Sequence, residues 1–297
     1  MTKNRKKLSG IFAPVVTPFK NDKVELSYLR ENLQKLGKTN LTGYLALGSN
    51  GEYKSLADRE QIKILEVFAQ TKGDKVVMVG TGCESTFQTI EKSKIVARMG
   101  FDFVSVLTPH YFAKKMDGAV LKDFYLQIAD SVDIPVLLYN APGFAGGVVI
   151  PPQTVSELSK HPNIAGMKDS APTGPAKFLT MLDPNEDFSV LAGSADFFYT
   201  SLHLGATGGT LSIANAMPEI CCELYQYFRK SDFEHAKEVH FRISRLNQAI
   251  SGSWGVAGVK AAMDIRGFKG GSPRHPLKEI TTEGIEKIRQ TILGEGF

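Results

Sequence analysis

Residues 103–139 read FVSVLTPHYFAKKMDGAVLKDFYLQIADSVDIPVLLY, and this stretch decides the fold class. It begins with a short apolar run, Phe103–Leu107, and ends with another, Val136–Tyr139. Between them, Asp117–Asp130 has the apolar spacing of an amphipathic helix. Nearly continuous apolar runs are typical of strands that are covered on both faces, as in a parallel sheet. The stretch therefore predicts a strand–helix–strand unit with parallel strands.

The same alternation recurs along the chain, with further helical patterns at 57–71 and 85–99. The predicted strands are Ile11–Val16, Tyr44–Leu47, Val76–Val79, Phe103–Leu107, Val136–Tyr139, Ile164–Met167, Ser189–Leu191 and Gly209–Ile213. Strand–helix units of about 25–30 residues predict the α/β class and a (β/α)8 TIM barrel. A doubly wound open sheet is the alternative, but no Gly-x-Gly-x-x-Gly turn follows the first strand.

From about Met217 the strands stop, while helical patterns continue to Leu293. We interpret residues 217–230 as the last barrel helix. The predicted organisation is therefore a catalytic barrel domain over 1–230 and a helical C-terminal extension over 231–297, packed on the barrel.

Composition argues against several classes of partner. The 297 residues carry a net charge of only +4, and their one dense basic cluster, Lys3–Lys7, reads as a terminal tail. Nucleic-acid binders concentrate basic residues in patches, so we expect no nucleic-acid partner. No apolar run reaches the roughly 18–20 residues that span a membrane, so we expect no membrane partner either. A mild positive charge suits a small anionic substrate.

The cysteines favour a reducing compartment, which we take to be the cytoplasm. There are three, Cys83, Cys221 and Cys222, without the spacing of a zinc site or a disulfide framework. We expect no metal. Pro14 and Pro18 interrupt the only candidate for a secretory segment, whereas an organelle-targeting segment in a longer chain stays open.

Lys168 directly follows a predicted strand, in Ile164-Ala-Gly-Met-Lys168-Asp-Ser170. In a barrel of this type, catalytic groups lie at the carboxyl ends of the strands. One interpretation is a lysine that extends its ammonium to solvent at the rim. The other is a Schiff-base lysine, because a neutral amine in a dry site can attack a carbonyl and the iminium then accepts electrons.

Tyr139 ends the preceding predicted strand, before the turn Asn140-Ala-Pro142-Gly143. A tyrosine on a buried strand is often a core residue with a satisfied hydroxyl. At a neighbouring strand end, however, its hydroxyl could transfer protons at the same substrate as Lys168.

The turn Gly48-Ser49-Asn50-Gly51-Glu52 follows another predicted strand. It can be an ordinary turn, or its small residues and amides can bind an anion, with Ser49 and Asn50 contacting a carboxylate. Gly193 and Ser194, after the seventh predicted strand, could admit a substrate closely. His110 has no partner spacing that indicates a base or a metal ligand.

Together, in this order, these motifs resemble the dihydrodipicolinate synthase / N-acetylneuraminate lyase family of class I aldolases. The resemblance covers nearly the whole chain and rests on Pro14-x-x-Thr17-Pro18-Phe19, Gly48–Glu52, Thr108–Tyr111, Tyr139-Asn140-x-Pro142, Gly166-x-Lys168-Asp169-Ser170, Gly258-x-Lys260 and Gly270-Gly271-x-Pro273. It implies that Lys168 forms the Schiff base and that no separate cofactor is needed. It also implies a proton relay of Tyr139, Ser49 and Tyr111, and a homotetramer (a dimer of dimers) in which Tyr111 reaches into a neighbouring subunit.

The resemblance is greatest to the 4-hydroxy-2-oxoglutarate aldolase branch, which shares Gly82-Cys83-Glu84-Ser85-Thr86, His161-Pro162-Asn163-Ile164 and Val190–Ala195. In the synthase branch, an arginine after the Tyr-Asn-x-Pro turn binds the carboxylate of the aldehyde substrate. Phe144 occupies that position here, and an apolar ring cannot form a bidentate carboxylate pair.

These observations predict an enzyme that cleaves a 4-hydroxy-2-oxo acid to pyruvate and an aldehyde. Its substrate contacts are Ser49, Asn50, Ser170, Gly193 and Ser194. One alternative is the condensation of pyruvate with aspartate semialdehyde, and another is a non-catalytic barrel that binds a 2-oxo acid.

Overall fold

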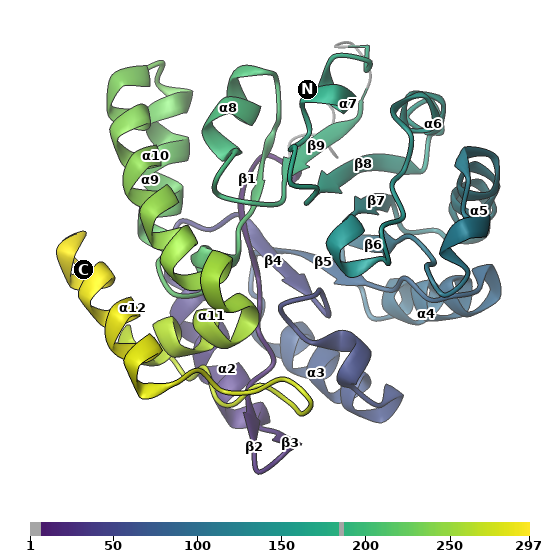
Figure 1. Cartoon of the computed structure of the whole chain (residues 1–297). Coiled ribbons are helices and arrows are strands. Elements are labelled where there is room, and N and C mark those ends of the chain that lie inside the picture. The colour runs from purple at the N-terminus through teal and green to yellow at the C-terminus, as the bar shows by residue number, and fades with distance from the viewer. Residues whose placement is uncertain (1–6, 184–186) are drawn as a thin grey trace. The chain divides into compact units, whose positions relative to one another are not determined.

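The computed structural model describes residues 7–183 and 187–297. In this part of the chain, eight parallel strands close into a barrel in the order β1-β10-β9-β8-β7-β6-β5-β4 (Figure 1). They are β1 (Gly10–Pro14), β4 (Gly43–Ala46), β5 (Val76–Gly80), β6 (Phe103–Leu107), β7 (Val136–Asn140), β8 (Ile164–Asp169), β9 (Ser189–Ala192) and β10 (Gly208–Thr210). The predicted α/β barrel is confirmed.

Helices alternate with these strands and continue after the last one, so the C-terminal helices are present as predicted (Figure 1). They are α2 (Leu26–Gly37), α3 (Asp58–Thr71), α4 (Thr86–Arg98), α5 (Gly118–Ser131), α6 (Pro152–Leu158), α7 (Ala176–Leu179), α8 (Phe198–His203), α9 (Pro218–Arg229), α10 (Phe233–Asn247), α11 (Ser253–Ile265) and α12 (Thr282–Gly294). Of the predicted basic tail, residues 3–6 lie outside the described residues, and Lys7 pairs with Asp102 at 2.6 Å.

The contacts divide the chain into two compact units, and the first contains 76–210 with the residues up to Ser9. Its strands β5 to β10 are hydrogen-bonded to one another in chain order. β6, β7 and β8 are buried along their whole length, as expected for strands covered on both faces. The register places Leu107 opposite Tyr139 and Tyr139 opposite Lys168, so the carboxyl ends of these strands are level.

The helix boundaries in this unit follow from local chemistry. Asp117 caps α5 by accepting a hydrogen bond from the Val120 N–H at 2.9 Å, and Ser85 caps α4 in the same way. After α4, Gly100 adopts a φ of 76°, which a residue without a Cβ takes at little cost. The helices predicted at 85–99 and 117–130 are therefore present within one residue at each end.

The second unit contains 10–75 and 211–297. In it, β1 pairs in parallel with β4, and a short hairpin that was not predicted joins β2 (Phe19–Lys20) to β3 (Lys23–Val24). The strand predicted to reach Ile213 ends earlier, and a 3-10 turn at Ser212–Asn215 follows it. In this turn, the Asn215 amide donates to the Pro14 carbonyl and accepts from the Val16 N–H.

Candidate active site

Lys168 is buried near the carboxyl end of β8, and only 6% of it is exposed. Its Nζ atom lies over the ring of Tyr139, 4.3 Å from the ring centroid. Among the residues that the structure describes, no carboxylate forms an ion pair with this nitrogen. The side chain is therefore largely buried and forms no ion pair in the described chain, which favours the Schiff-base interpretation over a lysine extended into solvent. A buried, unpaired amine is the arrangement that an attack on a carbonyl requires.

Tyr139 lies on β7, directly opposite Lys168 in the register of the two strands. It is 4% exposed, so it also qualifies as a core residue. Another buried tyrosine, Tyr125 of α5, has a purely structural contact, because its hydroxyl donates to the Val106 carbonyl at 3.0 Å. The feature that distinguishes Tyr139 is the amine on its ring face.

The residues after Tyr139 and Lys168 cross-link the two strands. The Nδ2 of Asn140 donates to Oδ1 of Asp169 at 2.6 Å, and both residues are fully buried. The Asn140 Oδ1 accepts from the Ile150 N–H at 3.0 Å, and this hydrogen bond anchors the C-terminal end of the loop after β7. Burial raises the pKa of the Asp169 carboxyl, while the hydrogen bond from Asn140 opposes that rise. Sequence reasoning assigned Asn140 only to a turn and missed this pair, because the predicted strands stopped at Tyr139 and Met167, whereas Asn140 and Asp169 end the observed ones.

Ser170 and Gly193 are in close contact. A Cβ on Gly193 would lie 2.0 Å from the Ser170 Oγ, so only glycine leaves room for this hydroxyl. The buried Ser170 Oγ has no hydrogen-bond partner within the described residues. Ser194 differs, because its hydroxyl donates to Asp196 at 3.2 Å and caps an exposed turn. Of the predicted substrate contacts, Ser170 and Gly193 thus lie against each other, whereas the Ser194 hydroxyl is hydrogen-bonded to Asp196.

Tyr111 lies in the loop after β6, and 78% of it is exposed in the single chain. Its ring packs edge to face on Phe112, with the ring centroids 4.9 Å apart. The loop is anchored by Glu84, whose Oε2 accepts from the backbone N–H groups of His110 and Tyr111, both at 2.8 Å. The His110 ring lies 3.2 Å from both the Glu84 carboxylate and the Thr108 carbonyl, so its contacts are local to the loop.

Phe144 lies in a 3-10 turn, Pro142–Phe144, in the loop that follows β7. Its ring is 60% exposed. The loop carries no charged side chain between Ala141 and Ile150, so it offers no cation to a substrate carboxylate.

In the second unit, the turn after β4 is internally bonded. The N–H of Gly51 donates to the Gly48 carbonyl and that of Glu52 to the Ser49 carbonyl, both at 3.0 Å. Thr17 supports the turn, because its hydroxyl donates to the Gly51 carbonyl at 2.7 Å. The Asn50 Nδ2 is buried and has no partner among the described residues, which leaves an amide donor available for an acceptor.

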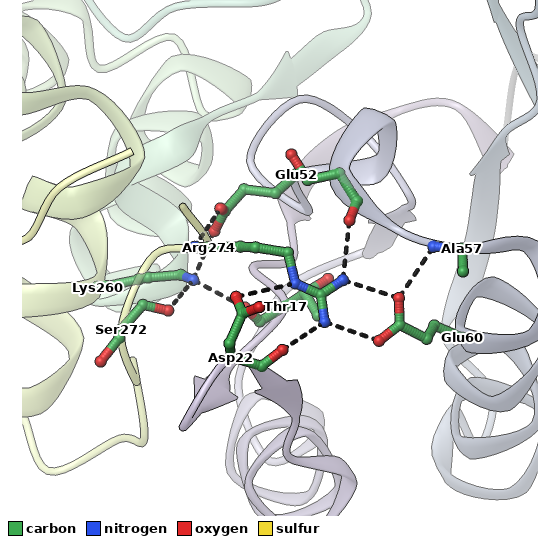
Figure 2. Close-up of polar contacts among 9 residues, drawn as sticks. Thr17, Asp22, Glu52, Ala57, Glu60, Lys260, Ser272 and Arg274 are labelled. Carbon is green, nitrogen blue, oxygen red and sulfur yellow. Dashed lines mark hydrogen bonds and ion pairs between the residues drawn. The ribbon is translucent and has the colours of Figure 1, made fainter. Parts of the chain in front are cut away.

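Glu52, the last residue of this turn, belongs to a buried ion pair (Figure 2). Lys260 of α11 contacts Glu52 at 2.5 Å, and their side chains are only 1% and 2% exposed. Burial lowers the pKa of Lys260, and the Glu52 charge opposes this. Beside the pair, Arg274 forms a bidentate ion pair with Glu60, at 2.7 and 2.8 Å. Sequence reasoning quoted Lys260 only within a family motif and missed its partner.

The described residues contain no group of histidine, cysteine and acidic side chains that could hold a metal ion. In the same part of the chain, no helix combines the length and the apolar character that crossing a membrane requires.

Comparisons with known proteins agree with this fold and identify the family. The family model described as the dihydrodipicolinate synthetase family matches residues 7–294. A 4-hydroxy-tetrahydrodipicolinate synthase of Methanospirillum hungatei is 33% identical over 95% of this chain and 98% of its own length. A probable mitochondrial 4-hydroxy-2-oxoglutarate aldolase of Emericella nidulans is 33% identical over 97% of this chain and 98% of its own.

Solved structures agree as well. A dihydrodipicolinate synthase from Thermotoga maritima superposes with a TM-score of 0.90 and 26% identity, covering 98% of this chain and 99% of that one. The fold, the buried lysine and these similarities define a carbon–carbon lyase or aldolase of class I. The chain belongs to the dihydrodipicolinate synthetase family.

Proposed function

We propose that this enzyme cleaves a 4-hydroxy-2-oxo acid, such as 4-hydroxy-2-oxoglutarate, reversibly to pyruvate and an aldehyde. The observation that carries the proposal is the Lys168 amine, which is buried, free of carboxylate partners among the described residues, and placed over Tyr139. An amine without a carboxylate partner is accessible to a ketone, with which it can condense to an iminium.

The proposed reaction begins when the Lys168 amine attacks the C2 carbonyl and water leaves, which gives an iminium. Tyr139 then accepts the proton of the C4 hydroxyl as the C3–C4 bond breaks. The bonding electrons flow into the iminium, which becomes an enamine, and the aldehyde is released. Protonation of C3 and hydrolysis of the iminium release pyruvate and regenerate the amine. The family motif assigns Ser49 and Tyr111 to the proton relay that serves Tyr139. No separate cofactor enters this scheme.

The substrate carboxylate is assigned to Ser49 and Asn50. The unpartnered Nδ2 of Asn50 supports this assignment, because a buried donor without an acceptor costs free energy that a bound carboxylate would recover. We assign Ser170, whose buried hydroxyl also has no partner in the described chain, and Gly193 to the same substrate. Ser194 is proposed only as a neighbour of the substrate, because its hydroxyl is held by Asp196.

The second candidate reaction is the condensation of pyruvate with aspartate semialdehyde. The names of several relatives favour it, including the synthase from Methanospirillum hungatei. Phe144 favours cleavage of a different substrate, because its loop offers no cation to the semialdehyde carboxylate.

We further propose that the enzyme is a cytoplasmic homotetramer, a dimer of dimers. The exposed ring pair of Tyr111 and Phe112 supports an interface with a second copy of the chain, since large exposed aromatic side chains favour contacts. The free cysteines suit a reducing compartment.

Parallel assays test the proposal. We expect the purified enzyme to release pyruvate from 4-hydroxy-2-oxoglutarate or a related 4-hydroxy-2-oxo acid, measured by reduction of the pyruvate with lactate dehydrogenase and NADH. Pyruvate with aspartate semialdehyde should react much more slowly. A faster reaction with aspartate semialdehyde than with any 4-hydroxy-2-oxo acid would overturn the choice of substrate.

A further inference from the structure

The turn that carries Ser49 and Asn50 ends in an unusual backbone conformation. Glu52 has a φ of 51° and a ψ of 36°, in the left-handed region that residues with a Cβ rarely adopt. Such a conformation persists only where the surroundings fix it. Here both carboxylate oxygens of Glu52 are engaged, Oε1 by the Lys260 ammonium at 2.5 Å and Oε2 by the backbone N–H of Arg274 at 2.9 Å.

Lys260 has every donor occupied. Its Nζ contacts Glu52 Oε1, the Thr17 carbonyl at 2.8 Å and the Ser272 carbonyl at 2.8 Å, which accounts for the three N–H groups of an ammonium (Figure 2). It reaches the turn by two routes, directly through Glu52 and through Thr17, whose hydroxyl donates to the Gly51 carbonyl. One side chain of α11 therefore fixes both the end of the turn and the carbonyl before it.

Fold stability alone is a poor explanation for this arrangement. Burying two opposite charges has a desolvation cost that often equals the gain from pairing them, and apolar residues of similar size can replace such pairs without loss of stability. What an ion pair adds is a unique geometry. The turn that it fixes presents the Asn50 Nδ2, a buried donor with no partner among the described residues. A donor held rigidly before the ligand arrives binds more tightly, because less ordering is needed.

We propose that Lys260, acting through Glu52, is a positioning residue that sets the affinity of the Ser49–Asn50 turn for the carboxylate of the 2-oxo acid. The proposal rests on the proposed function. It makes the α11 helix, far from the turn in sequence, a determinant of substrate affinity.

Three variants and one matched control test the proposal. Lys260→Met removes the ammonium, and Glu52→Gln keeps the length of the side chain and one acceptor. Lys260→Met/Glu52→Leu replaces the pair with apolar side chains. Glu60→Gln is the control, because it weakens the neighbouring ion pair with Arg274 and leaves the bonds from Lys260 to Glu52 and Thr17 in place. Folding is checked by circular dichroism and thermal melting.

The readout is the pyruvate concentration that gives half-maximal borohydride trapping, together with KM for each substrate and kcat. We expect Lys260→Met and the apolar double variant to raise the half-saturating pyruvate concentration by about 10- to 100-fold. This is the factor expected for the loss of one hydrogen bond to a charged group. Glu52→Gln should raise it by a smaller factor, about 3- to 10-fold, because Gln keeps one acceptor but loses the charge. The KM for the aldehyde and the kcat at saturating pyruvate should change by less than about threefold, and Glu60→Gln should match the wild type.

The double variant separates positioning from stability. If it folds as well as the wild type but binds pyruvate weakly, the proposal stands, and if it folds and binds pyruvate as the wild type does, Lys260 only stabilises the fold. If Lys260→Met or the double variant fails to fold, the Glu52→Gln variant provides the test. An unchanged half-saturating pyruvate concentration in Glu52→Gln would overturn the proposal. A wild-type protein that pyruvate and borohydride do not modify would instead overturn the proposed function itself.

Discussion

The Nζ atom of Lys168 lies over the face of the Tyr139 ring, 4.3 Å from its centroid, and the two residues are paired in the register of β7 and β8. The π face of a tyrosine attracts a cation, so it would stabilise the iminium that we propose on this nitrogen. The same contact holds the amine at a fixed point of the barrel without neutralising it by a carboxylate. One residue pair thus places a phenol beside the amine that we propose as the nucleophile.

Tyr139→Phe separates these two roles. The phenylalanine ring keeps the apolar face under Lys168 but loses the hydroxyl, so we expect pyruvate still to form a borohydride-trapped adduct. The kcat for cleavage should fall by about 10²- to 10⁴-fold, the usual contribution of a positioned acid–base group. Steady-state kinetics and intact-mass measurement check both parts. An unchanged kcat would remove Tyr139 from the proton transfers.

Asp169→Asn should change the dependence of stability on pH. Burial raises the pKa of Asp169, so the folded protein binds this proton more tightly than the unfolded chain does. The stability contributed by the protonated carboxyl is complete below the unfolded pKa of about 3.9 and is lost as pH rises through the raised, folded pKa. The amide of the substituted side chain carries no charge, so this loss disappears in the variant.

We therefore expect the free energy of unfolding of Asp169→Asn, relative to the wild type, to become more favourable as pH rises from 4 to 7. Urea denaturation across this range measures it. Asp133→Asn, the same substitution at an exposed position, is measured in parallel as the reference. A flat difference for Asp169→Asn would show that burial does not disfavour its charge.

Thiol labelling tests the burial of the cysteines. Burial raises the pKa of Cys222 to about 12 and raises that of Cys221 well above its ordinary value, so neither forms the reactive thiolate at pH 8. Cys83 is partly exposed. We expect one thiol to react quickly with 5,5′-dithiobis(2-nitrobenzoate) in the native protein and the other two only in denaturant. Rapid reaction of all three would contradict the packing of α9.

Phe144→Arg tests the origin of the substrate preference. The ring is exposed, so the substitution should leave the fold intact. A guanidinium at this position can bind a carboxylate through two hydrogen bonds, and we expect kcat/KM for aspartate semialdehyde to rise about 10-fold or more. Phe144→Leu, which adds no cation, should leave that value near the wild-type value. Equal kinetics for the two variants would show that residue 144 does not contact the aldehyde.

Local sequence patterns predicted the barrel because each strand–helix unit has its own apolar run and its own amphipathic stretch. Phe103–Leu107 is observed with the predicted bounds, since a strand covered on both faces is nearly continuously apolar, with Ser105 as the one polar residue here. The β2–β3 hairpin escaped prediction because its strands have only two residues each, too few for a period to be visible.

The site was predictable to the extent that strand ends could be located. Lys168 and Tyr139 were predicted because Lys168 follows one apolar run and Tyr139 ends another, and the structure brings these two residues together. The contacts of Asn140 with Asp169 and of Glu52 with Lys260 were not predictable. They join residues 29 and 208 positions apart, and nothing in the local sequence of one partner indicates the other.

The central claim is that the Lys168 amine condenses with a 2-oxo acid. Incubation with pyruvate and borohydride, followed by intact-mass and peptide measurement, tests it most directly. We predict a single reduced pyruvate adduct on Lys168 in the wild type and none in Lys168→Ala. A wild-type protein without an adduct, or an adduct that persists in Lys168→Ala, would contradict this mechanism.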